Sequence, residues 1–395
     1  HPDQDPAEAV RRALSDVEGA ALQAESELWR LRRDLTLVPG RGATPGRPAT
    51  PPGEGEAAPP GAAAVPAAGN ARAAAGEPTT WRTVSPGGET GCGLGDPFEF
   101  WVREGRADEW LIFLQGGGAC WTYATCGPGQ SMEFDAAVTV ADHDQRRSGI
   151  FDRANPDNPF RRATAVFVPY CTGDFHLGAR RVTYQAPPGS DPRSVTVNHG
   201  GYANVTAALD YLKTRPVSPD RITVVGASAG AVASPVVAAR LATLFPDASV
   251  QQVGDGAAGL RFPGSRRLLE HWGSPAALEA DGYAIPGTGD GFTALYRMAA
   301  DAQPRIHFSQ VATASDARVA AGLRLVGEDP GSVALRIQAS YAELAAAGIC
   351  FNGYVLPGAQ HTIVWSPELF SARVEGAPLL RKLRQEVLEA RCPGG

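Results

Sequence analysis

A serine between two glycines is the residue of this sequence best suited to covalent chemistry. Ser228 lies in the pattern G-x-S-x-G with Gly226 and Gly230, directly after the apolar run 222–225 and before a run of small and apolar residues. Small neighbours let the backbone turn sharply from a strand into a helix and expose the hydroxyl above the sheet edge. The alternative is a plain tight turn, because so short a pattern also arises by chance. The strand-to-helix setting favours Ser228 as a nucleophile.

A serine nucleophile needs a general base, and seven histidines compete for that role. His361 follows the last apolar run, 349–356, in a turn containing Gly358. In an α/β-hydrolase the chain runs in the order Ser, acid, His, and His361 is the histidine placed last. His307 lies within another apolar run, 306–312, and is expected to be a sheet or core residue. We predict His361 as the base.

Two aspartates follow the apolar runs between Ser228 and His361. Asp255 comes after the next run and Asp316 after the run beyond it. The usual position of the acid in this topology is two strands past the nucleophile strand, which favours Asp316. Asp255 is instead expected to accept hydrogen bonds from backbone N–H groups at the end of its strand.

Three consecutive glycines could complete the chemistry. Gly116, Gly117 and Gly118 follow the apolar run 110–114. Successive glycines allow backbone N–H groups to approach a substrate oxygen, and Ala229, the residue after the nucleophile, would supply another donor. The alternatives are a flexible turn or a phosphate loop, but no G-K-[ST] follows. This run is therefore predicted to be an oxyanion loop, and the mechanism requires no metal or organic cofactor.

These residues require an alternating series of strands and helices to position them. Short apolar runs predict buried parallel strands at 110–114, 164–169, 222–225, 250–254, 306–312 and 349–356. Helical patterns lie between or after them at 202–213, 229–244, 292–300, 333–347 and 378–390. This alternation predicts an α/β fold with a mostly parallel sheet and helices on both faces. Pro235, inside one predicted helix, is expected to kink it or to mark its start.

The sequence before residue 81 differs from this body. Residues 1–38 have a helix start at Asp5 and apolar positions spaced alternately by four and three, which predicts an amphipathic helix. In residues 39–78, 30 of 40 residues are Pro, Gly or Ala, which predicts a linker over 39–80. The catalytic domain is then 81–395. The helix could associate with another copy, dock on the body, tether the protein to a surface, or remain solvated.

Composition restricts the partners and the compartment. The net charge is −6, so nucleic acid is an unfavourable partner. The six cysteines lack the C-x-x-C spacing of a zinc site and favour disulfides, and hence a secreted or periplasmic protein. The start at His1 is expected to be a processed one. The uncharged run 222–239 contains glycines and Pro235, so no transmembrane segment is predicted.

Taken together, the motifs resemble the pectin acetylesterase family, which includes the animal Notum deacylases. The resemblance rests on residues 114–121 (LQGGGACW), residues 169–178 (PYCTGDFHLG), the Ser228 turn and residues 360–362 (QHT), and covers roughly 81–392. It implies an α/β-hydrolase fold and a serine carboxylesterase that removes acyl groups from a hydroxyl. It also implies the triad Ser228, Asp316 and His361, with Gly117, Gly118 and Ala229 as oxyanion donors.

Several expectations accompany this resemblance. Gln115 occupies a position where many members have Glu, and Gly118 and Ala119 positions where many have an aromatic residue, so we expect a different acyl pocket. We predict disulfides between Cys92 and Cys171, Cys120 and Cys126, and Cys350 and Cys392. Three functions remain open: a deacetylase of an acylated carbohydrate, an esterase or depolymerase of aliphatic esters or polyesters, and an inactive surface-binding protein. A complete triad in the right order argues against the third.

Overall fold

The computed structural model describes residues 80–128, 134–139, 142, 145–189, 192–286 and 292–387. All of them belong to one compact unit, 77–395. The helix predicted over 1–38 and the linker predicted over 39–80, except Thr80, lie outside the described residues.

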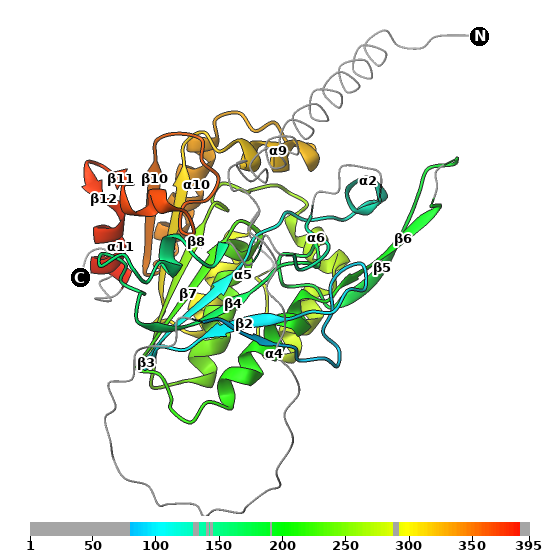
Figure 1. Ribbon diagram of the computed structural model, residues 1–395. Coiled ribbons are helices and arrows are strands. Elements are labelled where there is room, and N and C mark those ends of the chain that lie inside the picture. The colour runs from blue at the N-terminus through cyan, green and yellow to red at the C-terminus, as the bar shows by residue number, and fades with distance from the viewer. Residues whose placement is uncertain are drawn as a thin grey trace, which may run out of the picture. The chain divides into compact units, whose positions relative to one another are not determined.

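An eight-stranded sheet forms the centre of this unit (Figure 1). Its strand order is β1-β2-β4-β3-β7-β8-β9-β10. The neighbours from β4 to β10 pair in parallel, whereas β1 and β2 add an antiparallel edge. The strands are β1 (Arg82–Val84), β2 (Phe100–Arg103), β3 (Arg106–Leu114), β4 (Ala163–Val168), β7 (Arg221–Ala227), β8 (Ser249–Asp255), β9 (His307–Thr313) and β10 (Phe351–Leu356).

The helices lie on both faces of the sheet, as the sequence predicts. The longer ones are α4 (Gly201–Lys213), α5 (Ala229–Leu244), α8 (Thr293–Ala302), α9 (Ala317–Leu325), α10 (Val333–Ala346) and α11 (Leu379–Val387). Shorter ones are α2 (Tyr123–Cys126), α6 (Ser265–His271), α7 (Ser274–Ala280) and the 3-10 turns η1 (Gly149–Phe151) and η2 (Pro367–Phe370). Helix α5 packs on β7 and β8, and α4 and α8 pack on α5. The fold is therefore the predicted α/β-hydrolase-like arrangement.

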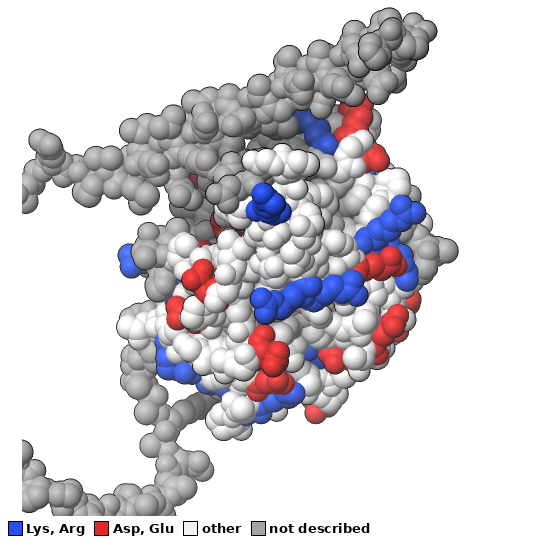
Figure 2. All heavy atoms as spheres, turned by 90° about the vertical axis from the view of Figure 1, so that its right-hand side faces the viewer, with Lys and Arg blue, Asp and Glu red and all other residues white. Residues whose placement is uncertain are grey.

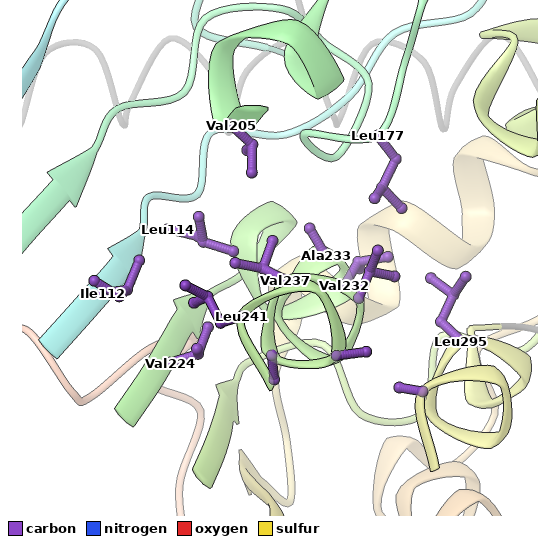
Figure 3. Close-up of a cluster of buried hydrophobic side chains, with 14 of the residues drawn as sticks. Ile112, Leu114, Leu177, Val205, Val224, Val232, Ala233, Val237, Leu241 and Leu295 are labelled. Carbon is purple, nitrogen blue, oxygen red and sulfur yellow. The ribbon is translucent and has the colours of Figure 1, made fainter. Parts of the chain in front are cut away.

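The larger core lies between the sheet and α5. Figure 3 shows Val237 and Leu241 of α5 beside Leu114 and Val224 of the sheet, with Val205 of α4 beyond them. These side chains are at most 2% exposed. A second core on the opposite face contains Phe113, Phe151 and Phe167, whose rings contact one another. Burial on both faces explains why the central strands are continuously apolar in sequence.

Six strands have no counterpart among the predicted ones. Two are the antiparallel edge β1 and β2, and two form the hairpin of β5 (Arg180–Gln185) and β6 (Ser194–His199), which projects from the body in Figure 1. The others are β11 (Arg373–Val374) and β12 (Ala377–Pro378). The hairpin strands mix exposed and buried positions irregularly. They therefore lack the continuous apolar run by which a buried strand is recognised in a sequence.

Two of the predicted disulfides are confirmed. Cys92 bonds to Cys171 and Cys120 bonds to Cys126. Cys350 is disulfide-bonded as well, and Cys392, its predicted partner, lies outside the described residues. Among the described helices, none has the length and hydrophobicity needed to span a membrane.

Candidate active site

Ser228 is held in a strained turn between β7 and α5. Its φ of 52° lies in the left-handed region, which a residue with a side chain rarely adopts. A Cβ at Gly226 would lie 2.2 Å from the carbonyl oxygen of Gly230, and a Cβ at Gly230 would lie 2.1 Å from that of Leu114. Both flanking glycines are thus required sterically, and the turn presents the Ser228 hydroxyl at the end of β7.

The structure brings Ser228, His361 and Asp316 together. The Oγ of Ser228 lies 2.8 Å from Nε2 of His361, and Nδ1 of His361 lies 2.8 Å from Oδ2 of Asp316. The side chain of Asp316 is 1% exposed and that of His361 is 26% exposed. A carboxylate oxygen accepts, so Nδ1 of His361 donates and Nε2 can accept the hydroxyl proton of Ser228. This is the geometry that activates a serine.

The side chain of Asp316 is held in place because it also caps a helix. It is the N-cap of α9, and its Oδ1 accepts from the N–H groups of Arg318 (2.9 Å) and Val319 (3.0 Å). Its other oxygen, Oδ2, is therefore left for His361. The loop carrying His361 is tied to the loop carrying Asp316, because the Thr313 hydroxyl donates to the Gln360 carbonyl at 2.8 Å.

Asp255 lies at the end of β8 and contacts the backbone rather than the imidazole. Its Oδ2 accepts from the N–H groups of Ile363 (2.6 Å) and Val364 (2.8 Å), just after His361, and its carbonyl accepts from Ser228 N–H at 2.7 Å. The carboxyl is 1% exposed, and burial raises its pKa to about 7 against the opposing effect of the two N–H bonds. Asp255 thus joins the serine turn to the histidine loop.

The start of the predicted oxyanion loop and Ala229 lie beside Ser228. A Cβ at Gly116 would come within 2.6 Å of the Ser228 Cβ, so the glycine loop passes directly against the nucleophile. Gly118 has a φ of 79°, which favours glycine. Ala229 is the first residue of α5, so its N–H has no acceptor within the helix.

Gln115 is a residue whose role the sequence analysis missed. It is 1% exposed, and its Oε1 accepts from Tyr170 N–H at 2.9 Å. Its Nε2 donates to Asp142 and to Oε1 of Gln145. The side chain therefore connects the start of the glycine loop to the segment after β4. Only its position next to three glycines could have indicated this in the sequence.

A hollow of about 460 Å³ is lined on one side by Trp121 and on the other by residues of α6, the end of α9 and the loop between β8 and α6. Trp121 lies three residues after Gly118, so at most ~11 Å of chain separates the two. The walls are mixed, with Phe262 and Leu268 beside Arg267, His271 and Glu328. This size is typical of small-molecule sites.

Among the described residues, one group has the spacing of metal ligands. Cys120, Cys126 and His199 place a sulfur or nitrogen atom within 4.8 Å of one another. The two sulfurs, however, are joined in a disulfide, so neither is available as a thiolate. These residues do not fit a metal.

Comparison with known proteins agrees with this architecture. Residues 90–263 match the family model described as "Pectinacetylesterase". A segment of 97 residues, 24% of this chain, is 32% identical to "Inactive palmitoleoyl-protein carboxylesterase notum1b" of Danio rerio and spans 70% of that protein.

Two further relatives match over a smaller share of their length. "Palmitoleoyl-protein carboxylesterase notum2" of Xenopus laevis is 32% identical over 94 residues, and "Palmitoleoyl-protein carboxylesterase NOTUM" of Mus musculus is 31% identical over 91. In both cases the match covers 22% of this chain and 18% of the relative. The family match and the extent of the zebrafish relative show that this chain belongs to the pectinacetylesterase family, a family of carboxylic ester hydrolases.

Proposed function

We propose that this protein is a secreted serine carboxylesterase that removes acetyl groups from a hydroxylated substrate such as a polysaccharide. The observation that carries the proposal is the continuous chain of contacts from Ser228 through His361 to Asp316, at 2.8 Å for each step. Residues of these three types in this order activate a hydroxyl for attack on an ester carbonyl. The two disulfides support an oxidising compartment.

The reaction has two steps. Oγ of Ser228 attacks the ester carbonyl while His361 Nε2 takes its proton, and the N–H groups of Gly117, Gly118 and Ala229 stabilise the tetrahedral oxyanion. His361 then returns the proton to the alcohol oxygen, which leaves, and an acyl-enzyme remains. Water hydrolyses this intermediate in the reverse manner and releases the acid. Loss of one oxyanion donor typically costs about 3 kcal/mol of transition-state stabilisation.

The hollow beside Trp121 supports a sugar as the alcohol. A polyol can stack its C–H face on an aromatic ring and hydrogen-bond to polar groups such as Arg267, His271 and Glu328. A long aliphatic chain would shield these groups from water and offer them no hydrogen bonds of its own, which is unfavourable. Helix α9 separates Asp316 from Leu325, another lining residue, by nine residues, or ~13 Å of helix. The hollow thus suits units beyond the reacting ester.

The mechanism is tested with Ser228→Ala and a phosphonate label. The variant should lose ester hydrolysis by several orders of magnitude while keeping the wild-type unfolding midpoint, and an organophosphonate should label Ser228 alone. Ser218→Ala, at an exposed serine before β7, is the control and should keep full activity. Labelling of another residue, or activity in the Ser228→Ala variant above a few per cent, would refute the proposal and favour an inactive binding protein.

The substrate class is tested separately. The wild type should release acetate from acetylated oligosaccharides more efficiently than it hydrolyses p-nitrophenyl palmitate or an aliphatic polyester film. Trp121→Ala should raise KM for the oligosaccharide about tenfold and leave p-nitrophenyl acetate unaffected. A preference for long aliphatic esters would instead support the esterase or depolymerase alternative.

A further inference from the structure

The segment after β4 contains a strained turn to which the proposed reaction assigns no role. Phe175 has a φ of 55° and His176 a φ of 60°, so two consecutive residues with side chains adopt the left-handed region. Such strain persists only where the surroundings enforce it, and it gathers at functional sites. Ser228, the proposed nucleophile, shows the same feature.

A fully buried carboxylate enforces this turn. Oδ1 of Asp174 accepts from the Thr172 hydroxyl at 2.6 Å and from His176 N–H at 3.0 Å, while Oδ2 accepts from Gly201 N–H, at the start of α4, at 2.8 Å. The hydroxyl of Tyr170 accepts from Phe175 N–H at 2.9 Å. A Cβ at Gly201 would lie 2.6 Å from the His176 Cα, so the helix packs directly against the turn.

The result of this arrangement is a defined direction for one imidazole. Nε2 of His176 lies 2.8 Å from the carbonyl oxygen of Gln115, and the side chain is 2% exposed. Burial lowers the pKa of His176 to about 4, so the ring is neutral at pH 7. A carbonyl can only accept, so Nε2 carries the proton and donates it to Gln115.

The acceptor is the first peptide of the proposed oxyanion loop. The Gln115 carbonyl and the Gly116 N–H are opposite ends of one planar peptide, so a bond to one end orients the other. The three glycines that follow have wide backbone freedom and do not set their own direction. On its other side the loop contacts Ser228, where a Cβ at Gly116 would lie 2.6 Å from the Ser228 Cβ. The loop therefore contacts Ser228 on one side and His176 on the other.

We propose that His176 is a positioning residue for the oxyanion loop. Its Nε2–H fixes the peptide between Gln115 and Gly116, and the orientation of this peptide directs the N–H groups of Gly117 and Gly118 toward the oxyanion. This inference rests on the proposed esterase function. It assigns to the segment 169–178 the task of holding the loop in its reactive geometry before substrate arrives. Preorganised donors stabilise the transition state more than the bound substrate, so their loss affects kcat rather than KM.

The test compares variants at His176 in the full chain with p-nitrophenyl acetate. His176→Ala should lower kcat about 100-fold and leave KM within about threefold, because a displacement of about 1 Å in a reactive group costs this much. His176→Gln, whose amide can donate to the same carbonyl, should have a kcat at least tenfold higher than that of His176→Ala. Affinity for phenylboronic acid, which forms a tetrahedral adduct on a reactive serine, should fall in parallel with kcat.

His199→Ala is the matched control. His199 is fully buried, its Nδ1 lies 2.9 Å from the Thr172 carbonyl in the same segment, and burial lowers its pKa to about 4 as well. Its removal should destabilise the fold comparably but leave kcat within about threefold. If His176→Ala does not fold, His176→Gln and His176→Leu give the same comparison, because only the first can donate.

The outcomes separate the two proposals. Suppose that the wild type is active and is labelled at Ser228. If kcat is then unchanged in His176→Ala, or falls equally in His199→Ala, the role of His176 is overturned and the esterase proposal stands. A rise in KM with kcat unchanged also overturns it, since the residue would then act on substrate binding. A wild type with no ester hydrolysis and no label at Ser228 overturns the esterase proposal and this inference with it.

Discussion

Two aspartates at the ends of neighbouring strands have different roles because their hydrogen-bond partners differ. Asp316 follows β9, caps α9 with one oxygen and meets His361 with the other. Asp255 is the last residue of β8 and accepts from two backbone N–H groups just after His361. Both are about 1% exposed, so burial does not distinguish them. Their partners do, and this difference can be measured.

The first prediction concerns the acid of the proposed triad. Asp316→Asn should lower kcat by up to ~10⁴, because an amide can no longer set the histidine tautomer. The fold should be retained, since Asn is also a good N-cap. Asp255→Asn should act mainly on stability and leave most of kcat. Steady-state kinetics with urea unfolding would check both. A folded, inactive Asp255→Asn beside a nearly normal Asp316→Asn would transfer the role to Asp255.

The second prediction concerns pH. The pKa of Asp255 is raised from 3.8 to about 7, so the folded protein keeps a proton that the unfolded chain releases. The contribution of Asp255 to the free energy of unfolding is fully present below pH 3.8. It is lost at ~1.4 kcal/mol per pH unit as the pH rises to about 7.

Asp255→Asn should abolish this dependence. The wild type should therefore lose stability relative to the variant between pH 4 and 7, and no further above pH 7. Other buried groups, such as His176, titrate in both proteins and cancel in the difference. Urea unfolding of the two proteins at pH 4.5, 6 and 7.5 provides the measurement. A constant difference across this range would contradict the assignment.

At the scale of elements, the nucleophile helix α5 accommodates a proline without ending. Pro235 lies inside the helix and lacks the N–H that would donate to the carbonyl of Ala231, four residues earlier. The hydroxyl of Ser234 donates to that carbonyl at 2.8 Å instead. The neighbouring serine thus satisfies the acceptor that the proline leaves open. Pro235 lies in the interior of α5, so it does not mark the start of this helix.

The third prediction contrasts the two disulfides that have both cysteines among the described residues. The bond between Cys92 and Cys171 closes 79 residues and that between Cys120 and Cys126 closes 6. On the chain-entropy model their removal costs ~4.5 and ~2 kcal/mol respectively. The activity should respond in the opposite order, because Cys120 follows the glycine loop by two residues and its N–H donates to the Gly173 carbonyl at 3.0 Å.

Paired Cys→Ala variants would test this reversal. In urea unfolding, the variant without the Cys92–Cys171 bond should lose more stability. In assays with p-nitrophenyl acetate, the variant without the Cys120–Cys126 bond should lose more of kcat. The idea fails if one variant shows the larger loss in both measurements.

For the whole molecule, the described unit contains all the groups that the proposed reaction needs. Its charged surface is mixed: on the face drawn in Figure 2, basic and acidic side chains of the described residues lie close together. No broad field of one sign covers the described part of that face.

The fourth prediction concerns the sequence before this unit. Deleting residues 1–78 should leave kcat/KM on p-nitrophenyl acetate within about twofold, because residues 39–78, in which 30 of 40 are Pro, Gly or Ala and none is aromatic, are predicted to be a linker that has no means of shaping a pocket. Oligomeric state or retention on a polymer should change if the predicted helix over 1–38 associates or tethers. A large loss of activity on this small ester would mean that the segment contributes to the active site.

The amino-acid sequence by itself determined the features that depend on local pattern. Ser228 between its glycines, the glycine run at 116–118 and the continuous apolar strands follow from residue type and spacing, because steric limits on a tight turn and burial on two faces act over a few residues. The six predicted strands all occur in the sheet, and two predicted disulfides are present.

Only the tertiary structure decided which groups meet. Asp255 and Asp316 both follow apolar runs, and the sequence favours Asp316 only through the usual topology; the order β7-β8-β9 together with the α9 cap sets which carboxylate reaches His361. The bond from His176 to the Gln115 carbonyl joins residues 61 positions apart and depends on a strained turn that no periodicity reveals. Contacts of this kind are set by the packing of distant segments, and for that reason they are absent from any short window of the sequence.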